Sequence, residues 1–379
     1  MAKRGPHCTL RRMEEKDIKQ PPPPIKKRER LAPEIFQLPV EKMREGYYSD
    51  KYFLYARDVL LAENDRRQVT MQIFCKKQAY LGGVDEAIAI LKLCLTRGFR
   101  WSDLEVLALR DGDPVEPWET TMLIRGPYAA FAHLETVYLG VLARRTKVAT
   151  NTRKVVETAW PKPVIFFPAR HDHWLVQTGD GYAAHIAGAI GVSTDAQASW
   201  WGSSGIGTVP HALIAATGGD TVKASLAFAK HMPQHVRVIS LVDFDNDCVG
   251  TSLEVARALG PRLFGVRLDT SEMMVDKSVM EQMGRLRPTG VNPQLVRNVR
   301  AALDKEGYTD VKIVVSGGFD TAKIRQFTEM NVPVDSYGVG SALLNDNYDF
   351  TADVVLLEDK PVAKAGREYQ PTARLEVVE

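Results

Sequence analysis

Acidic and basic residues stand directly after two apolar segments of this sequence. Asp243 follows Val236–Val242, and Arg267 and Asp269 follow Val266. A carboxylate at such a place can hold ribose hydroxyls, a magnesium ion or a developing positive charge. An ion pair with a neighbouring arginine would be a purely structural role for either aspartate. We therefore treat both aspartates as candidate catalytic residues and the arginine as a candidate substrate ligand.

Two later apolar segments end in glycine-rich loops. Glycine lets backbone N–H groups approach an anion closely, and the helix that follows adds its dipole. A pair of tight turns would also explain the glycines. Barrels of alternating strands and helices often bind phosphate with the loops after their last two strands. The ordered pair of loops therefore predicts phosphate binding at Ser316, Gly317, Gly318, Gly338, Gly340 and Ser341.

Histidines offer a different chemistry. His171 and His173 follow an apolar segment and match the H-x-H pattern that opens metal-dependent barrel hydrolases. Such a site needs further ligands at later strand ends, for which His211 and Asp269 are available. His211 also stands near an expected helix start that Thr208 could cap. The hydrolase interpretation is kept as an alternative from another functional class.

The second half of the chain predicts the elements that position these residues. Continuous apolar segments alternate there with amphipathic helical patterns, which is typical of a parallel sheet covered by helices. In an α/β barrel the active site forms at the carboxyl ends of the strands. We predict a catalytic barrel over residues 146–345, with strands at Val164–Phe167, Val236–Val242, Leu263–Leu268, Val311–Val315 and Val334–Val339 and helices at Thr251–Leu259 and Thr321–Met330.

The first half predicts a separate two-layer domain. Residues 1–40 contain Pro21–Pro24 and the basic run Lys26–Arg30, which predict a flexible tail. Residues 41–145 form the domain itself. Its expected elements are strands at Val69–Cys75, Leu104–Arg110 and Thr120–Arg125, a helix at Asp85–Thr96 capped by Asp85, and a long helix from Pro127 to about Lys147.

Composition excludes several classes of protein. The 379 residues are 45% apolar and 25% charged, as in an ordinary globular protein and unlike a disordered chain, a collagen or a coiled coil. A formal net charge of +2 gives no reason to expect a nucleic-acid partner. The four cysteines are scattered, which disfavours a disulfide framework or a zinc ribbon and suits the cytoplasm. No membrane span and no secretory signal are predicted.

Six segments, in the same order, resemble the nicotinate phosphoribosyltransferase family, with nicotinamide and quinolinate phosphoribosyltransferases as more distant relatives. They run from near the start of the first domain to the last glycine loop. The segments are GYYSDKYF (46–53), LETVYLGVLARRTKVAT (134–150), GTVPHALI (207–214), GVRLDTSE (265–272), KIVVSGGFD (312–320) and YGVGSALL (337–344).

The resemblance implies an irregular α/β barrel packed against an α/β sandwich that residues 346–379 complete. It implies transfer of phosphoribose from phosphoribosyl pyrophosphate to the ring nitrogen of nicotinate, which gives nicotinate mononucleotide and pyrophosphate in NAD salvage. Mg²⁺ would accompany the pyrophosphate, and ATP is an expected co-substrate. A homodimer or higher oligomer with shared active sites is implied as well. No structural zinc is expected, because no cysteine follows Cys248.

The resemblance also assigns roles to individual residues. Tyr52 is similar to a ring-stacking tyrosine donated across a dimer interface, and Phe167 to the aromatic residue on the other face of the pyridine. Arg170 would contact the pyridine substituent or a phosphate. His211 resembles a histidine that ATP can phosphorylate. The groups that would position ribose, pyrophosphate and the 5′-phosphate are Asp243, Arg267, Asp269, Thr208 and the two glycine loops.

Asp195 leaves the identity of the pyridine open. It lies where nicotinate enzymes usually present Ser or Asn and nicotinamide enzymes present Asp. A carboxylate would repel the carboxylate of nicotinate but could accept hydrogen bonds from an amide NH₂. Nicotinamide, or quinolinate, is therefore an alternative substrate. A catalytically inactive barrel that only binds a nucleotide is a further possibility.

Overall fold

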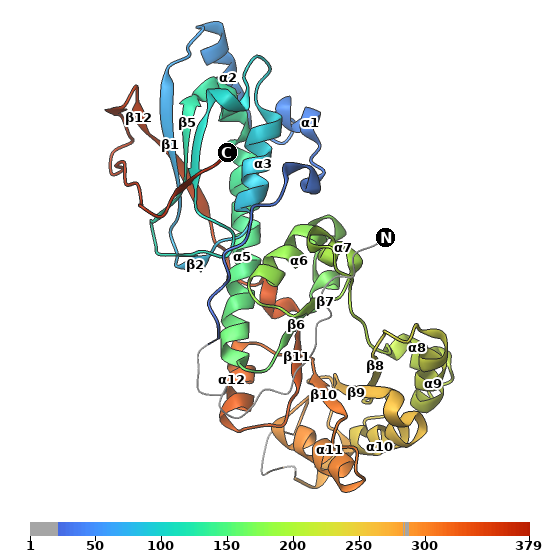
Figure 1. The fold of residues 1–379 in the computed structure, drawn as a ribbon. Helices are drawn as coiled ribbons and strands as arrows, with labels where there is room; N and C mark the ends of the chain where they lie inside the picture. The colour runs from blue at the N-terminus through green and yellow to red at the C-terminus, as the bar shows by residue number, and fades with distance from the viewer. Residues whose placement is uncertain (1–21, 283, 285–287) are drawn as a thin grey trace. The chain divides into compact units, whose positions relative to one another are not determined.

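A computed structural model describes residues 22–282, 284 and 288–379, which fall into two compact units (Figure 1). One unit contains residues 152–181 and 188–344, and we call it the barrel unit. The other contains residues 24–151, 182–187 and 345–379, and we call it the sandwich unit. The part of the predicted tail before residue 22, Pro21 included, lies outside the described residues.

The sandwich unit is built on a six-stranded sheet in the order β13-β12-β1-β5-β3-β14. β1 (Gln68–Cys75) is central and pairs antiparallel with both β5 (Thr120–Pro127) and β12 (Phe350–Leu357). β14 (Glu376–Val377) pairs with β3 (Glu105–Ala108). Early and late segments of the chain therefore share one sheet. The remaining strands are β13 (Lys360–Pro361) and a separate pair, β2 (Ala79–Tyr80) with β4 (Pro114–Val115).

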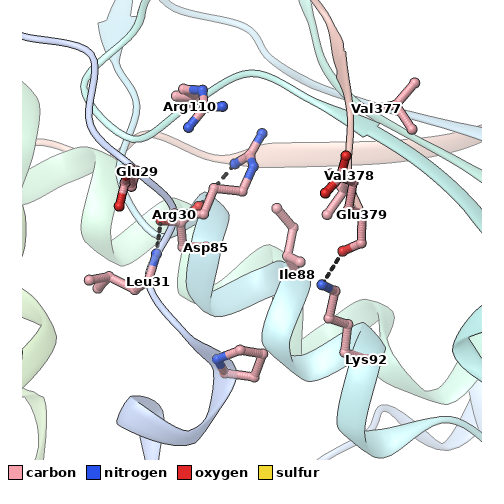
Figure 2. Close-up of a pocket in the computed structure, with 11 residues that line it drawn as sticks. Glu29, Arg30, Leu31, Asp85, Ile88, Lys92, Arg110, Val377, Val378 and Glu379 are labelled. Atoms are coloured by element: carbon pink, nitrogen blue, oxygen red, sulfur yellow. Dashed lines mark hydrogen bonds and ion pairs between the residues drawn. The ribbon is translucent and has the colours of Figure 1, made fainter.

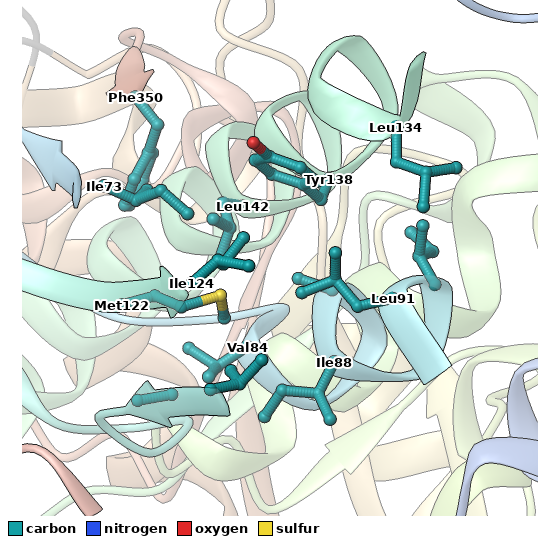
Figure 3. Packing of buried hydrophobic residues seen from close by; sticks show 14 of the residues in the cluster. Ile73, Val84, Ile88, Leu91, Met122, Ile124, Leu134, Tyr138, Leu142 and Phe350 are labelled. Carbon is teal, nitrogen blue, oxygen red and sulfur yellow. The ribbon is translucent and has the colours of Figure 1, made fainter. Parts of the chain in front are cut away.

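Helices cover this sheet through an apolar core (Figure 3). Ile73 of β1 and Phe350 of β12 lie in one cluster with Ile88 of α3 (Val84–Cys94) and Tyr138 of α5 (Glu135–Ala159). Nearly every side chain of α3 is buried, so its apolar run is explained by packing on the helix's whole circumference. The other helices of the unit are α1 (Val40–Arg44) and α2 (Lys51–Ala62), with single 3₁₀ turns at Pro33–Phe36 and Trp101–Asp103.

Two helix predictions in this unit are corrected. Asp85 does not cap α3, because Gly83 is the N-cap and the carboxylate of Asp111 accepts the N–H of Val84 at 2.7 Å. The single helix expected from Pro127 is broken into α4 (Tyr128–Phe131), a 3₁₀ turn (Ala132–Leu134) and α5. At the break, His133 is fully buried and its Nε2 lies 3.2 Å from the carbonyl of Cys94. α5 then continues to Ala159, twelve residues beyond Lys147.

Part of the segment predicted as a tail is held on the sandwich unit (Figure 2). The guanidinium of Arg30 pairs with Asp85 at 2.9 Å, and the N–H of Leu31 donates to the same carboxylate. Arg110 reaches back to the carbonyl of Arg28. A cavity of about 470 Å³ lies between this segment, α3 and β14, and Arg30, Asp85, Lys92 and Arg110 are among the residues that line it.

The barrel unit contains a six-stranded sheet in the order β7-β6-β11-β10-β9-β8, and every pairing is parallel. This confirms the predicted α/β class and the five predicted strands within two residues. β7 and β8 are the two free edges of the sheet, which curls as an open half-barrel. The strands are β6 (Val164–Phe166), β7 (Gly191–Val192), β8 (Val238–Leu241), β9 (Leu263–Leu268), β10 (Lys312–Val315) and β11 (Ser336–Val339).

Helices follow the strands as predicted. α10 (Cys248–Leu259) begins three residues earlier than expected because the carboxylate of Asp247 caps it by accepting the N–H of Gly250 at 3.0 Å. α12 (Thr321–Glu329) agrees with the prediction to one residue. The others are α6 (Gln177–Ile186), whose residues from Tyr182 on belong to the sandwich unit, α7 (Asp195–Ala198), α8 (His211–Ala216), α9 (Thr221–His231) and α11 (Pro293–Lys305), with 3₁₀ turns at Ala169–His171, Trp174–Val176, Ser199–Trp201, Gly260–Arg262, Lys277–Gln282 and Ser341–Leu344.

Candidate active site

Arg267 is the centre of a polar network at the carboxyl edge of the parallel sheet. Its Nε donates to Ser316 Oγ at 2.8 Å, and its two terminal nitrogens donate to Thr208 Oγ1 and Asp269 Oδ2, both at 3.2 Å. The guanidinium also lies 5.1 Å from the ring centroid of Phe167. Four predicted site residues from separate loops are thus brought onto one cation. Its planar fork is held by three acceptors and a ring, so its direction is fixed.

Asp269 is equally constrained. Ser316 Oγ donates to its Oδ1 at 2.7 Å while Arg267 donates to its Oδ2. Both carboxylate oxygens are thus held in place at the end of β9, where the group can stabilise a positive charge that develops nearby.

A second acid is paired with the predicted histidine. His211 Nε2 lies 3.0 Å from Asp243 Oδ1, with the imidazole 46% exposed and the carboxylate 6% exposed. Burial raises the pKa of Asp243; the nearby charge of His211 lowers it and that of Asp269 raises it. A carboxylate only accepts hydrogen bonds, so Nε2 is the nitrogen that carries a proton toward Asp243, and in the neutral form of the ring the lone pair is on Nδ1. The lone pair of a neutral, half-exposed imidazole that is held in this way can act as a nucleophile.

The two glycine loops lie beside this network, and each has a steric reason for its glycines. Gly317 (φ +83°) and Gly318 (φ +65°) adopt the left-handed conformation that side chains disfavour. A Cβ on Gly338 would lie 2.5 Å from the ring of Phe167, and one on Gly340 would lie 2.8 Å from the imidazole of His171. The last two glycines therefore admit aromatic side chains as well as an approaching anion.

Backbone donors in these loops are unoccupied. Within the part of the chain that the structure describes, the N–H groups of Gly317, Gly318 and Gly340 form no hydrogen bond. Successive free N–H groups near a helix start make a concave site for an anion. The predicted phosphate binding by these loops stays a prediction.

Three predicted residues lie outside the network. Tyr52 belongs to α2 of the sandwich unit and is 62% exposed. Arg170 is exposed in the 3₁₀ turn after β6. Asp195 is the first residue of α7, and its Oδ1 accepts the N–H of Gly205 at 2.8 Å. Their predicted contacts with a pyridine or a phosphate stay predictions.

Thr208 does not cap α8, in contrast to the prediction. The N-cap of α8 is Pro210, which offers no side-chain acceptor, and the Thr208 hydroxyl instead accepts from Arg267. This extended stretch before α8 brings Thr208 to the site.

The H-x-H pair is placed differently from a metal site. His173 caps the turn Trp174–Val176 by accepting the N–H of Leu175, and His171 lies against Gly340. Over residues 22–282, 284 and 288–379, no three His, Cys, Asp or Glu side chains are grouped as a metal ion would need. The donors required by the hydrolase alternative are therefore not assembled there.

Sequence reasoning missed two residues beside the Ser316–Gly318 loop. Glu272 is exposed, and its Oε1 lies where a Cβ on Gly318 would be. Lys323 donates from Nζ to the carbonyl of Gly317 at 3.1 Å. Both line a cavity of about 540 Å³ between α11 and α12. The lysine carried a signal, because cations are unfavourable in the first turn of a helix.

None of the described helices combines the length and the apolar character that crossing a membrane demands.

Comparisons with known proteins agree on one family. Residues 50–146 match the family model for the N-terminal domain of quinolinate phosphoribosyl transferase. A nicotinate phosphoribosyltransferase of Mycobacterium tuberculosis (pncB1) is 30% identical over 250 residues, which are 65% of this chain and 51% of that protein. A nicotinate phosphoribosyltransferase of Bacillus subtilis is 24% identical over 62% of this chain and 45% of that protein. The chain spans about half the length of these curated relatives.

Solved structures extend the likeness over most of the chain. A nicotinate-nucleotide pyrophosphorylase from Pyrococcus furiosus is 32% identical with a TM-score of 0.75, over 89% of this chain and 84% of that one. Human nicotinic acid phosphoribosyltransferase has a TM-score of 0.66 at 17% identity, over 85% of this chain and 77% of that one, which supports the fold alone.

Proposed function

Because the chain belongs to the nicotinate phosphoribosyltransferase family, we propose that it makes nicotinate mononucleotide in NAD salvage. The reaction transfers phosphoribose from phosphoribosyl pyrophosphate to the ring nitrogen of nicotinate and releases pyrophosphate. The observation that carries this proposal is the network that joins Arg267, Asp269, Ser316 and Thr208 beside two loops with free N–H groups.

The chemistry needs opposite charges on two sides of one carbon. The bond from ribose C1 to the pyrophosphate oxygen breaks with its electron pair on oxygen, and the lone pair of the pyridine nitrogen forms the new C1–N bond. Asp269, held by Ser316 and Arg267, would stabilise the positive charge on the ribose. Arg267 and Arg170 are the cations proposed for the departing pyrophosphate or the pyridine carboxylate.

The 5′-phosphate of the donor and the pyridine each have a proposed binding element. The 5′-phosphate would bind to the free N–H groups of Gly317, Gly318 and Gly340. Phe167 would stack on the pyridine, a contact worth about 1 kcal/mol.

Magnesium fits the donor set only together with the substrate. Both oxygens of Asp269 are engaged, whereas among the side chains that the structure describes Asp243 is bonded to His211 alone, through Oδ1. Asp243 would therefore hold Mg²⁺ through one oxygen, with pyrophosphate oxygens completing the shell, as is usual for this ion. The ion would neutralise charge on the leaving pyrophosphate.

ATP would act at His211. The Nδ1 lone pair of the imidazole would attack the γ-phosphorus of ATP, forming a P–N bond and releasing ADP. Asp243 would hold the imidazole by its Nε2–H and stabilise the positive charge that forms on the ring. ATP is thus proposed as a co-substrate that stimulates the transfer.

A second copy of the chain is the proposed partner. Tyr47, Tyr48, Tyr52 and Tyr55 are exposed on and before α2, with Val59 on the same helix. An aromatic surface of this kind is typical of protein interfaces. We propose a homodimer in which Tyr52 of one protomer contributes to the site of its partner.

A product assay tests the function. Purified protein is incubated with phosphoribosyl pyrophosphate, Mg²⁺ and equal amounts of nicotinate, nicotinamide and quinolinate, with and without ATP, and the products are identified by mass spectrometry. We expect nicotinate mononucleotide, in a yield that rises with ATP. Nicotinamide mononucleotide instead would mean that the carboxylate of Asp195 binds an amide. No mononucleotide under either condition would refute the transferase proposal.

A further inference from the structure

Lys323 occupies a position where a cation is electrostatically unfavourable. It is the third residue of α12, and its backbone N–H donates to the capping carboxylate of Asp320 at 2.8 Å. The first turn of a helix carries partial positive charge, so acidic residues are favoured there. The side chain folds back, and Nζ donates to the carbonyl of Gly317 at 3.1 Å while lying 4.4 Å from the ring centroid of Phe319.

The contact fixes more than one atom, because the peptide between Gly317 and Gly318 is trans and planar. In a trans peptide the carbonyl and the N–H point in opposite directions. Holding the carbonyl of Gly317 therefore also fixes the direction of the N–H of Gly318. Both glycines have positive φ, and glycine crosses between conformations at little cost. Without an anchor, this peptide could rotate.

The base of the anchor is rigid. Phe319 is 3% exposed and packs against Phe327 at 5.0 Å and Tyr337 at 5.5 Å between ring centroids. The ammonium of Lys323 thus lies between a fixed ring and the loop carbonyl. This bracket orders the long side chain, which would otherwise be free to move.

The same chain contains a natural counterpart without the contact. Gly218-Gly219-Asp220-Thr221 precedes Lys223 on α9, and the N–H of Lys223 donates to Asp220 at 2.8 Å as in α12. There, however, the N–H groups of Gly218 and Gly219 are spent on carbonyls of α8, and Lys223 is exposed. The local sequence alone does not create the Lys323 contact. The contact is made with the loop in which, among the described residues, the N–H groups of Gly317 and Gly318 form no hydrogen bond.

We infer that Lys323 is a positioning residue that aims the N–H of Gly318 at the 5′-phosphate of phosphoribosyl pyrophosphate. The inference rests on the proposed function for the identity of the phosphate ester. Lys323 acts through the loop and also adds a positive charge behind it. Its loss should weaken binding of the phosphate and leave the bond-making step untouched.

A binding experiment tests this independently of turnover. The full chain and its K323M, K323R and K223M variants are titrated calorimetrically with ribose 5-phosphate. We expect K323M, whose unbranched side chain is one atom shorter and carries no donor, to bind about tenfold more weakly, as for the loss of one hydrogen bond to a charged group. K323R should stay within about threefold of the unmodified chain and K223M should equal it. Equal affinity of K323M and the unmodified chain would overturn the inference.

Steady-state kinetics provides the second readout. K323M should raise KM for phosphoribosyl pyrophosphate about tenfold while kcat and KM for nicotinate change less than twofold. A fall in kcat with unchanged KM would contradict a positioning role. If K323M melts well below the unmodified chain, K323Q, whose amide stops one bond short, replaces it. Absence of turnover in the unmodified chain would refute the proposed function, and the titration would still decide the role of Lys323.

Discussion

Both carboxylate oxygens of Asp269 accept hydrogen bonds. An amide of the same shape at this position therefore tests the negative charge while it changes the geometry little. Asp269→Asn keeps an acceptor for Ser316 but removes the negative charge and weakens the hold on Arg267. We expect kcat to fall about 10²–10³-fold, as for the loss of one preorganised electrostatic group. The measurement is the initial rate of nicotinate mononucleotide formation at saturating substrates.

Asp335→Asn is the matched control for this change. Asp335 stands before the amino end of β11, away from the candidate site, and accepts the N–H of Ile313 at 2.8 Å. An amide oxygen can replace that acceptor, so the rate should stay within about twofold. A D269N enzyme as fast as D335N would remove Asp269 from the mechanism.

His211 should matter for ATP and less for transfer itself. His211→Ala removes the nitrogen lone pair that Asp243 orients. We expect ATP stimulation to disappear and the transfer without ATP to persist at a measurable rate. The checks are rates with and without ATP, and acid-labile phosphate on the protein after incubation with γ-labelled ATP. Label on H211A, or stimulation equal to that of a His231→Ala control, would refute the assignment.

At the residue scale, the sequence predicted which side chains lie together in the site but only some of the hydrogen bonds between them. Arg267, Asp269 and Ser316 were identified from their places at strand ends, since parallel strands bring those ends to one edge. The acceptor role of Thr208 was not predictable, because its partner is 59 positions away along the chain. The contact of Lys323 with Gly317 depends on a side-chain conformation that periodicity does not reveal.

At the scale of elements, the predicted helix boundaries were wrong where a residue far away in the sequence contacts the helix end. The strands of the barrel unit carry continuous apolar runs that only a doubly covered sheet explains, and they were predicted within two residues. Asp85 was expected to cap α3, but the helix begins one residue earlier, at Val84, whose N–H donates to the carboxylate of the distant Asp111. The break before α5 arises from the burial of His133 against Cys94, which no local pattern shows.

Glu135, the first residue of α5, makes the stability of the sandwich unit depend on pH. Burial, the main cause, raises its pKa from 4.5 to about 7, although Tyr128 donates to its carboxylate at 3.3 Å. Below pH 4.5 the group is protonated in both states. As pH rises from 4.5 to 7 the unfolded chain loses this proton first, so the free energy of unfolding falls. The full loss is about 3 kcal/mol.

Glu135→Gln is neutral at every pH and keeps an acceptor for Tyr128. We expect the variant to be more stable than the unmodified chain at pH 8, by up to about 3 kcal/mol, and equally stable at pH 4.5. Urea unfolding at both pH values measures this, with Glu63→Gln, at an exposed glutamate, as control. A stability difference that does not change with pH would contradict the assignment.

At the scale of the whole molecule, the sequence predicted two parts and their fold classes, but the sheet of the sandwich unit shows why pairing is harder. β12 lies between β13 and β1, with Val69 opposite Leu357, although nearly 290 residues separate them. Nothing in the sequence of this segment names the strand with which it pairs. Family resemblance, and not periodicity, supplied the expectation that residues 346–379 complete this domain.

The proposed shared site predicts that two defective chains restore each other. Tyr52→Ala removes a residue given to the partner's site, and D269N disables the site of its own protomer. In a mixed dimer one site carries both changes and the other carries neither. Random reassembly of equal amounts makes half of the dimers mixed, so we expect about a quarter of the unmodified rate at low nicotinate. If each site were built within one chain, the rate of the mixture would be no higher than the average of the rates of the two variants. Sedimentation of the mixture verifies the dimers, and a monomer by that measure would refute the shared site directly.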